Sequence, residues 1–273
     1  MLGIANLLTP GWVKLREEAE QQQFEKMAKT PTAWDALKTK WAERLVLDGK
    51  TYKPESIIPE APVVSARDRI AAAKKDGVHS PSGRFVYVHI RLPRGRPLDL
   101  YQPGDKVGKV RFTTAVNIPS LMEWKKGGHD ATTWMGLSPS EMMTQRNGIR
   151  KASGEVVVYG LGMGWFLAQV CAKKSVTRVT VVEREQEILD WLRPRVEAYY
   201  PQVKEKVAEW VCMDAYEYVD AHTDAADRRA HLFDIWAGWK EAPWDTKFQR
   251  LKAYLPRIWG WGDHYVKERY GWR

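Results

Sequence analysis

The spacing of apolar and polar residues changes twice along the 273-residue chain. Within residues 1–80, helical stretches with apolar residues at intervals of three and four flank a connecting arm, residues 48–64, that has three prolines and no period. Residues 81–135 contain stretches that alternate apolar and polar residues, which indicates strands. From residue 136 onward, short apolar runs alternate with helical stretches, a pattern typical of βαβ units around a parallel sheet. We therefore expect an N-terminal helical region, a β-hairpin or small sheet with a loop, and an α/β domain over residues 136–273.

The N-terminal half predicts five elements. Residues 11–29 and 32–47 show helical spacing, and residues 66–77 predict a short helix that ends at a glycine. Residues 84–92 and 109–118 alternate as strands do, and a β-hairpin is the simplest interpretation. A loop rich in glycine follows this hairpin.

The C-terminal half predicts strands and helices in alternation. The expected strands cover residues 155–160, 178–183, 208–214 and 231–237, and the expected helices cover residues 138–152, 165–174, 186–200, 215–230 and 245–257. Only one helix is predicted after the fourth strand. The sheet is therefore either partly truncated at the C-terminus or completed by strands from the N-terminal half.

Two local signals lie in these predicted helices. Ser138 is a suitable N-cap, and Glu141 three residues later completes the pattern of a capping box. Pro194 lies inside the helix predicted over residues 186–200 and marks a break there.

The sequence VVVYGLGMGW, residues 156–165, runs from a buried strand into three alternating glycines. Glycine lets a chain turn sharply and lets a ligand approach the backbone, so Gly160, Gly162 and Gly164 predict a ligand at the carboxyl edge of the sheet. A tight turn needed only for packing is the alternative. Trp165 occupies the position that completes a dinucleotide-binding fingerprint with glycine, which disfavours NAD and FAD.

Acidic residues accompany the next three strands. Glu183 ends the second strand, 23 residues after Gly160, where a carboxylate accepts hydrogen bonds from both ribose hydroxyls. Asp214 ends the third strand and is placed either to bind an adenine amino group or to cap the following helix. Asp234, in the fourth strand, is placed near the reacting end of a bound cofactor. Together these residues predict an adenosine ligand without a pyrophosphate.

The motifs GLGMG, VVERE, CMDA and FDIW resemble the successive motifs of class I S-adenosylmethionine-dependent methyltransferases. The helix SPSEMM before the glycine strand is similar to that of spermidine synthase-like proteins. The resemblance implies a Rossmann-like sheet over residues 136–273 that binds S-adenosyl-L-methionine. It implies that Gly160, Gly162 and Gly164 border the methionine portion of the cofactor, Glu183 its ribose, and Asp214 and Ala215 its adenine. The further implied cofactor-binding residues are Leu161, Met163 and Arg184. Asp234 is the implied catalytic residue, near the nucleophile of the acceptor.

The loop DIWAGWKEAPW, residues 234–244, departs from the related enzymes. It lacks the acidic pair and proline with which spermidine synthases hold an amine, and it lacks the Asn/Asp-Pro-Pro-Tyr/Phe turn of DNA amino-methyltransferases. Trp236 and Trp239 are placed to form a wall of the site. Three functions stay open: methyl transfer to an unidentified acceptor, aminopropyl transfer, and a non-catalytic binding module.

The net charge of +9 is concentrated in the N-terminal half. Residues 1–150 carry 24 Lys and Arg against 16 Asp and Glu, a net of +8, whereas residues 151–273 carry 19 against 18, a net of +1. Two basic clusters are Arg91, Arg94 and Arg96, and Lys125 and Lys126. These clusters suit nucleic-acid phosphates or an acidic partner, and a solvated basic face is the alternative.

The cysteines, the apolar runs and the histidines predict the compartment of the protein and its relation to membranes and metals. Cys171 and Cys212 lie in apolar patterns, which predicts two buried thiols in a reducing, cytoplasmic compartment. No apolar run approaches the ~20 residues that span a bilayer, so no membrane role is expected. The six histidines show no metal-binding spacing, so no metal is expected. A homo-oligomer is compatible with the sequence.

Overall fold

A computed structural model describes residues 40–42, 46–47, 50–51, 54–93, 97–102, 106–112, 114–224, 226–238, 241–242 and 245–263. The expected helix over residues 11–29 lies outside these residues. The helix expected over residues 32–47 is wrong where the structure describes it, because β1 (Lys40–Ala42) and β2 (Val46–Leu47) are strands. β1 pairs with another strand, and such tertiary pairing overrides a local helical preference.

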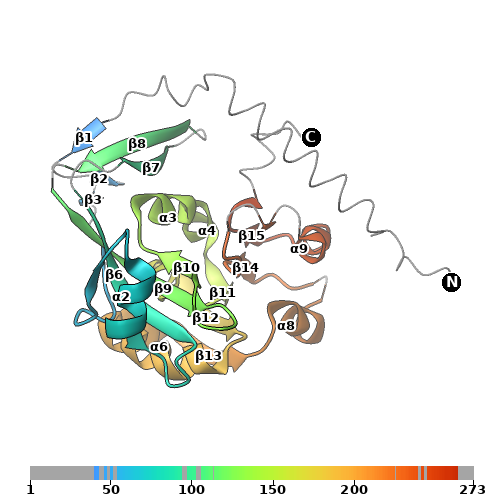
Figure 1. Cartoon of the computed structure of the whole chain (residues 1–273). Helices are drawn as coiled ribbons and strands as arrows, with labels where there is room; N and C mark the ends of the chain where they lie inside the picture. Colours follow the sequence, from blue (N-terminus) through green and yellow to red (C-terminus); the bar gives the residue numbers. More distant parts are fainter. Residues whose placement is uncertain are drawn as a thin grey trace, which may run out of the picture.

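The C-terminal part contains a five-stranded parallel sheet with the strand order β13-β12-β11-β14-β15 (Figure 1). These strands are β11 (Gly154–Tyr159), β12 (Val176–Glu183), β13 (Val207–Cys212), β14 (Ala230–Phe233) and β15 (Ile258–Gly260). In chain order this arrangement is 3-2-1-4-5, which is the order of Rossmann-like sheets. The predicted α/β, Rossmann-like fold is confirmed.

The fifth strand, β15, was not predicted. It pairs with β14, whereas none of the described N-terminal strands joins this sheet. The sheet is therefore extended by a segment close to the C-terminus and not by the N-terminal half.

Alternate residues of the central strand β11 face two different layers of helices, as the pleat of a strand requires. Val156 and Val158 pack in a core shared with α5 (Trp165–Cys171), α6 (Gln186–Tyr199) and α7 (Pro201–Lys206). Val157 and Tyr159 pack in a second core with α8 (Ala215–His222) and α9 (Thr246–Leu251). Both faces of the sheet are thus covered, which explains the uninterrupted apolar run of the strand.

The predicted helices are present with different limits. Pro194 lies inside α6 and does not break it. α8 ends at His222, earlier than expected, and α9 is also shorter than predicted. The helix expected over residues 138–152 is divided at Gln145 into α3 (Pro139–Thr144) and α4 (Arg146–Lys151).

A mixed sheet, mostly antiparallel, precedes the Rossmann-like part. β6 (Phe85–Leu92) pairs with β9 (Val116–Trp124) over its whole length, which confirms the first expected strand. The single strand expected over residues 109–118 is wrong, because its two ends belong to different sheets. The other strands of this region are β4 (Val63–Ser65), β5 (Val78–His79) and β10 (Ala131–Gly136) beside β6 and β9, β7 (Pro97–Gln102) and β8 (Lys106–Phe112) beside β1, and β3 (Lys50–Thr51) beside β2.

The short helix α2 (Arg69–Asp76) ends before Gly77, as predicted. β4 and β5 lie before residue 80 and nevertheless pair with β6. The domain boundaries expected at residues 80 and 135 stay predictions.

The mixed sheet of β4, β5, β6, β9 and β10 is anchored to the first turn of α6. Arg84 donates to Glu185 at 2.7 Å, and the backbone N–H of Ser82 donates to Glu187 at 2.7 Å. Phe85 and Tyr87 extend the same core that lies under α5 and α6. This attachment holds the end of β10 over the glycine turn.

Candidate functional site

The glycine turn after β11 requires glycine at each of its three positions. Gly160, Gly162 and Gly164 have φ values of +93°, +51° and +75°, which side chains other than glycine rarely adopt. A Cβ at Gly164 would lie 2.5 Å from Cγ2 of Val196 in α6. A Cβ at Gly160 would lie 3.1 Å from the carbonyl carbon of Asp234. The turn thus serves close packing as well as access to the backbone.

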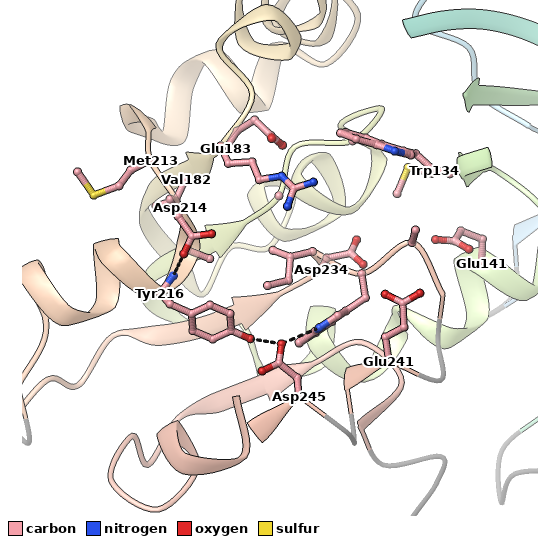
Figure 2. A pocket seen from close by; sticks show the side chains of 18 residues that line it. Trp134, Glu141, Val182, Glu183, Met213, Asp214, Tyr216, Asp234, Glu241 and Asp245 are labelled. Atoms are coloured by element: carbon pink, nitrogen blue, oxygen red, sulfur yellow. Dashed lines mark hydrogen bonds between the residues drawn. The ribbon is translucent and has the colours of Figure 1, made fainter. Parts of the chain in front are cut away.

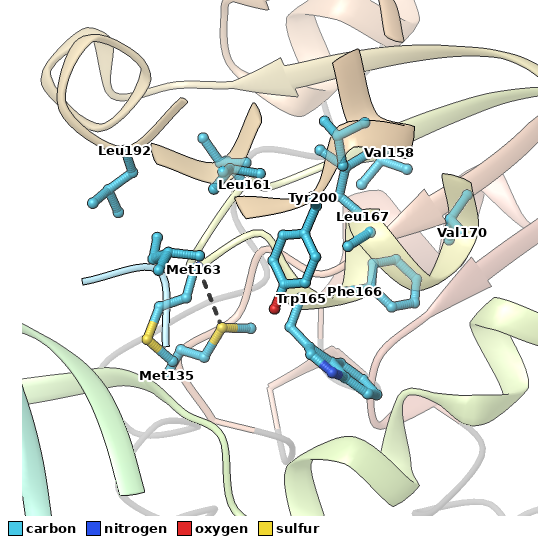
Figure 3. Close-up of a cluster of buried hydrophobic side chains, with 14 of the residues drawn as sticks. Met135, Val158, Leu161, Met163, Trp165, Phe166, Leu167, Val170, Leu192 and Tyr200 are labelled. Atoms are coloured by element: carbon cyan, nitrogen blue, oxygen red, sulfur yellow. Dashed lines mark hydrogen bonds between the residues drawn. The ribbon is translucent and has the colours of Figure 1, made fainter. Parts of the chain in front are cut away.

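The other residues of the turn face the protein core (Figure 3). Leu161 and Met163 are buried side chains of the large core cluster, and the N–H of Met163 donates to Sδ of Met135 at 3.4 Å. Trp165 is also buried in this cluster. Neither Leu161 nor Met163 lines the cavity described next, so their side chains are not placed to contact a ligand there.

A cavity of about 350 Å³ opens at the carboxyl edge of the parallel sheet (Figure 2). This volume lies in the range of small-molecule sites, about 300–1,000 Å³. The cavity brings together most of the predicted site residues, but not Leu161, Met163 or Gly164. Its lining comprises Trp134, Met135, Glu141, Gly160, Gly162, Val182, Glu183, Arg184, Met213, Asp214, Ala215, Tyr216, Asp234, Ile235, Trp236, Ala237, Glu241 and Asp245.

Glu183 is held at the sheet edge by two backbone hydrogen bonds. Its side chain is 6% exposed, and its two oxygens accept the backbone N–H groups of Leu161 at 2.9 Å and Glu185 at 3.0 Å. Burial raises the pKa of this carboxyl, while the two N–H groups act in the opposite direction. Since a carboxylate oxygen accepts more than one hydrogen bond, each oxygen retains capacity for a ligand hydroxyl.

Arg184 and Asp214 flank Glu183 at the same edge. Arg184 is exposed, and its Nε lies 3.3 Å from Oε1 of Glu185. Oδ1 of Asp214 accepts the N–H of Tyr216 at 2.8 Å, so this residue caps α8, the alternative role considered from the sequence. Asp214 also lines the cavity, so capping does not exclude ligand binding.

Asp234 follows directly after β14, because this strand ends at Phe233 and not at residue 237 as predicted. Its Oδ2 accepts a hydrogen bond from Nε2 of Gln145 at 2.8 Å, and the same Nε2 also donates to Oε1 of Glu141 at 3.2 Å. Burial raises the pKa of Asp234 to about 7. Burial and the charge of Asp234 raise the pKa of Glu141 well above its usual range.

Indole rings line the cavity from two different parts of the chain. Trp134, from β10, donates to Glu123 at 2.8 Å and packs edge-on against Phe85. Trp236 donates to Oδ2 of Asp245 at 3.1 Å, and this oxygen also accepts the hydroxyl of Tyr216 at 2.6 Å. Both rings are therefore held by hydrogen bonds. Trp239 lies outside the described residues.

The charges of the cavity lining are strongly unequal. Among the described residues of the lining, Arg184 is the single basic one, against six acids, Glu141, Glu183, Asp214, Asp234, Glu241 and Asp245. Figure 2 shows Asp214 and Glu141 at opposite ends, with Asp234 between them. A cationic ligand is therefore favoured electrostatically over an anionic one.

Several cavity residues were not found from the sequence. Glu141 was interpreted as the second half of a capping box, and Ser138 does cap α3 by accepting the N–H of Glu141 at 3.2 Å. The carboxylate of Glu141, however, bonds Gln145 and not the N-cap backbone. Trp134, Gln145 and Glu241 carried no local signal, because only the fold brings them to the sheet edge.

Other predictions concern residues away from the cavity. Cys171 is buried as expected, whereas the expectation for Cys212 is wrong because this residue is exposed on the edge strand β13. Arg91, Lys125 and Lys126 are exposed. Arg94 and Arg96 lie outside the described residues.

The described residues contain neither an arranged metal site nor a helix suited to a membrane. Within them, no group of three or more His, Cys, Asp or Glu residues is arranged to hold a metal ion. None of the helices described is long and apolar enough to cross a membrane.

Comparisons with known proteins give weak similarities. No protein-family model matches the chain, and no curated protein matches it by sequence. Spermidine synthase from Thermotoga maritima is 16% identical with a TM-score of 0.29, and the match covers 48% of this chain and 52% of that one. Trm5b from Pyrococcus abyssi is 13% identical with a TM-score of 0.31, and the match covers 72% of this chain and 54% of that one. The chain thus spans about half the length of either protein, and its fold assignment rests on the strand order.

Proposed function

We propose that the cavity binds an adenosyl sulfonium cofactor, S-adenosyl-L-methionine, and that the protein transfers its methyl group to an acceptor. The observation that carries this proposal is the position of Glu183. Its carboxylate is tied to the glycine turn through the N–H of Leu161 and faces the same cavity as Gly160 and Asp214. A ribose between these residues would find an acceptor for both hydroxyls.

The residues along the cavity follow the same order as the parts of this cofactor that we assign to them. Asp214 and the exposed Arg184 border the end assigned to adenosine, and Asp234 lies toward the other end. The acidic lining suits a ligand whose sulfonium carries a positive charge. A dinucleotide would bring two phosphates to this acidic lining and is disfavoured.

The residues of the chain then act by orientation and proton transfer. The bound cofactor supplies an electrophilic methyl carbon on sulfur. Trp134 and Trp236 limit the positions that an acceptor can take and exclude water from the reacting atoms. Asp234 is the group placed to take a proton from the acceptor.

A second candidate function, aminopropyl transfer, is supported by one specific observation. Glu141 and Glu241 line the cavity together with Asp234, although the sequence after β14 contains no acidic pair of the expected kind. Carboxylates from two different segments would hold a cationic amine as well as a local pair would. They would also disfavour the carboxylate of S-adenosylmethionine, which the decarboxylated cofactor lacks.

Calorimetry with four ligands separates these functions. We expect S-adenosylmethionine and S-adenosylhomocysteine to bind the full chain and NAD not to bind. Tighter binding of decarboxylated S-adenosylmethionine than of S-adenosylmethionine would favour aminopropyl transfer. Failure of all three adenosyl ligands to bind would refute the proposal and leave a non-catalytic module of this fold.

A further inference from the structure

We propose that Glu141, Gln145 and Asp234 form one proton-sharing unit, in which Glu141 holds a proton and Gln145 keeps Asp234 ionised as the base for the acceptor. The base role rests on the proposed function. The sharing of the proton is a property of the protein without ligand.

The geometry of Gln145 is the first observation. Its side chain is fully buried between α3 and α4, and its Nε2 donates to Asp234 at 2.8 Å and to Glu141 at 3.2 Å. An amide nitrogen carries two hydrogens, one for each carboxylate. The Oε1 atom of Gln145 is buried with no hydrogen-bond partner within the described structure. The residue therefore keeps an unfavourable orphan oxygen in order to place its donor between the two acids.

The second observation is the shortage of compensating positive charge. The other titratable groups among the described residues that line the same cavity are Glu183, Arg184, Asp214, Tyr216, Glu241 and Asp245. Arg184 is the basic one, and its side chain is 61% exposed and lies beside Glu185. Two ionised carboxylates at one buried donor would repel each other without a cation to offset them, so one of them retains a proton.

The unequal bond lengths decide which acid is ionised. The shorter hydrogen bond goes to Asp234, and a charged acceptor makes the shorter and stronger bond. Burial raises the pKa of both acids, but only the pKa of Glu141 is raised further by the charge of the other acid, which agrees with this choice. Asp234 is thus the carboxylate, and Glu141 is the neutral acid.

This assignment gives a balanced transfer step. The nucleophilic atom of the acceptor forms a bond to the transferred carbon as the carbon–sulfur bond breaks and its electron pair passes to sulfur. The acceptor loses one proton to the carboxylate of Asp234, which becomes a carboxylic acid. Gln145 acts here as a positioning residue, since it contacts Asp234 and not the reacting atoms.

Carboxyl ¹³C NMR titration of the full chain without ligand tests the unit, with the Asp234 signal assigned through Asp234→Asn. We expect Gln145→Met to raise the pKa of Asp234 by about one unit, a tenfold change in its acid dissociation constant, because the ionised form loses its donor. We expect Glu141→Gln to leave the Asp234 titration nearly unchanged, because a neutral side chain replaces a neutral acid.

Two results would overturn the proposal. One is an unchanged Asp234 titration in Gln145→Met. The other is a fall of more than about one unit in the pKa of Asp234 in the Glu141→Gln variant, which would mean that Glu141 carries the charge. If Gln145→Met does not fold, the isosteric Glu141→Gln variant still decides the assignment. Because no cofactor is present, a negative outcome here is distinct from a failure of the proposed function.

Discussion

Gly160 and Asp234 contact each other through their backbones, so that the glycine turn and the candidate base form one rigid unit. The N–H of Asp234 donates to the carbonyl of Tyr159 at 2.9 Å, and a Cβ at Gly160 would collide with the Asp234 carbonyl group. The position of the base therefore depends on the absence of a side chain at residue 160.

Gly160→Ala should destabilise the protein by about 3 kcal/mol, because strained backbone and steric overlap both contribute. Gly83→Ala is the matched control, since Gly83 has a φ of +75° but nothing within 4 Å of an added Cβ. The free energy of unfolding of the control, measured in urea, should fall by only about 1 kcal/mol, because backbone strain alone contributes. Equal losses in the two variants would show that the contact with Asp234 contributes nothing.

The raised pKa of Asp234 predicts that the protein loses stability as the pH rises. The carboxyl titrates near pH 4 in the unfolded chain, by the usual value for Asp. Burial raises its pKa to about 7 in the folded protein. Between these values the folded state binds one more proton than the unfolded state, so the free energy of unfolding falls with rising pH.

Asp234→Asn should reduce this dependence and make the variant more stable than the parent at pH 8, by at most about 4 kcal/mol, and similar to it at pH 4. The raised pKa of Glu141 leaves a residual dependence of the same sign. Urea unfolding at both pH values measures the difference. Asp190→Asn, on the exposed face of α6, serves as the control. A constant offset between Asp234→Asn and the parent across this range would contradict the assignment.

The unpredicted strand β15 should be sensitive to substitution of Gly148 in α4. A Cβ at this position would lie 2.6 Å from Cε3 of Trp259 in β15. Gly148→Ala should therefore cost about 1–3 kcal/mol, although alanine favours a helix by about 1 kcal/mol.

A double-mutant cycle with Trp259→Leu isolates this contact. The cost of Gly148→Ala should shrink or change sign when the indole is absent. The same cost in both backgrounds would mean that α4 and β15 do not pack as the structure shows.

The parts of the fold that were predictable depend on neighbouring residues in the chain. The four apolar strands of the parallel sheet are visible as short runs between helical stretches, and Glu183 is the last residue of one of them. The glycine turn is visible for the same reason. Leu161 and Met163 were assigned to the ligand with the rest of the turn, but their side chains point into the core.

The parts that were not predictable depend on contacts between distant segments. β15 has three residues, too few to show a period, and it is defined by pairing with β14. Residues 109–118 form one alternating run that the fold divides between two sheets. Glu141 fits a capping pattern locally, and only the approach of Asp234 reveals it as part of the site.

The most direct test of the central claim is the affinity of Glu183→Gln for S-adenosylhomocysteine, measured by calorimetry. Glutamine keeps one oxygen for the N–H of Leu161 but loses the charge and the second acceptor that a ribose would need. Glu197→Gln, paired with Arg193 on α6, is the matched control. We predict a loss of about 10–100-fold for Glu183→Gln and none for the control. Equal affinity of Glu183→Gln and the parent chain would contradict the ribose assignment and with it the proposed cofactor site.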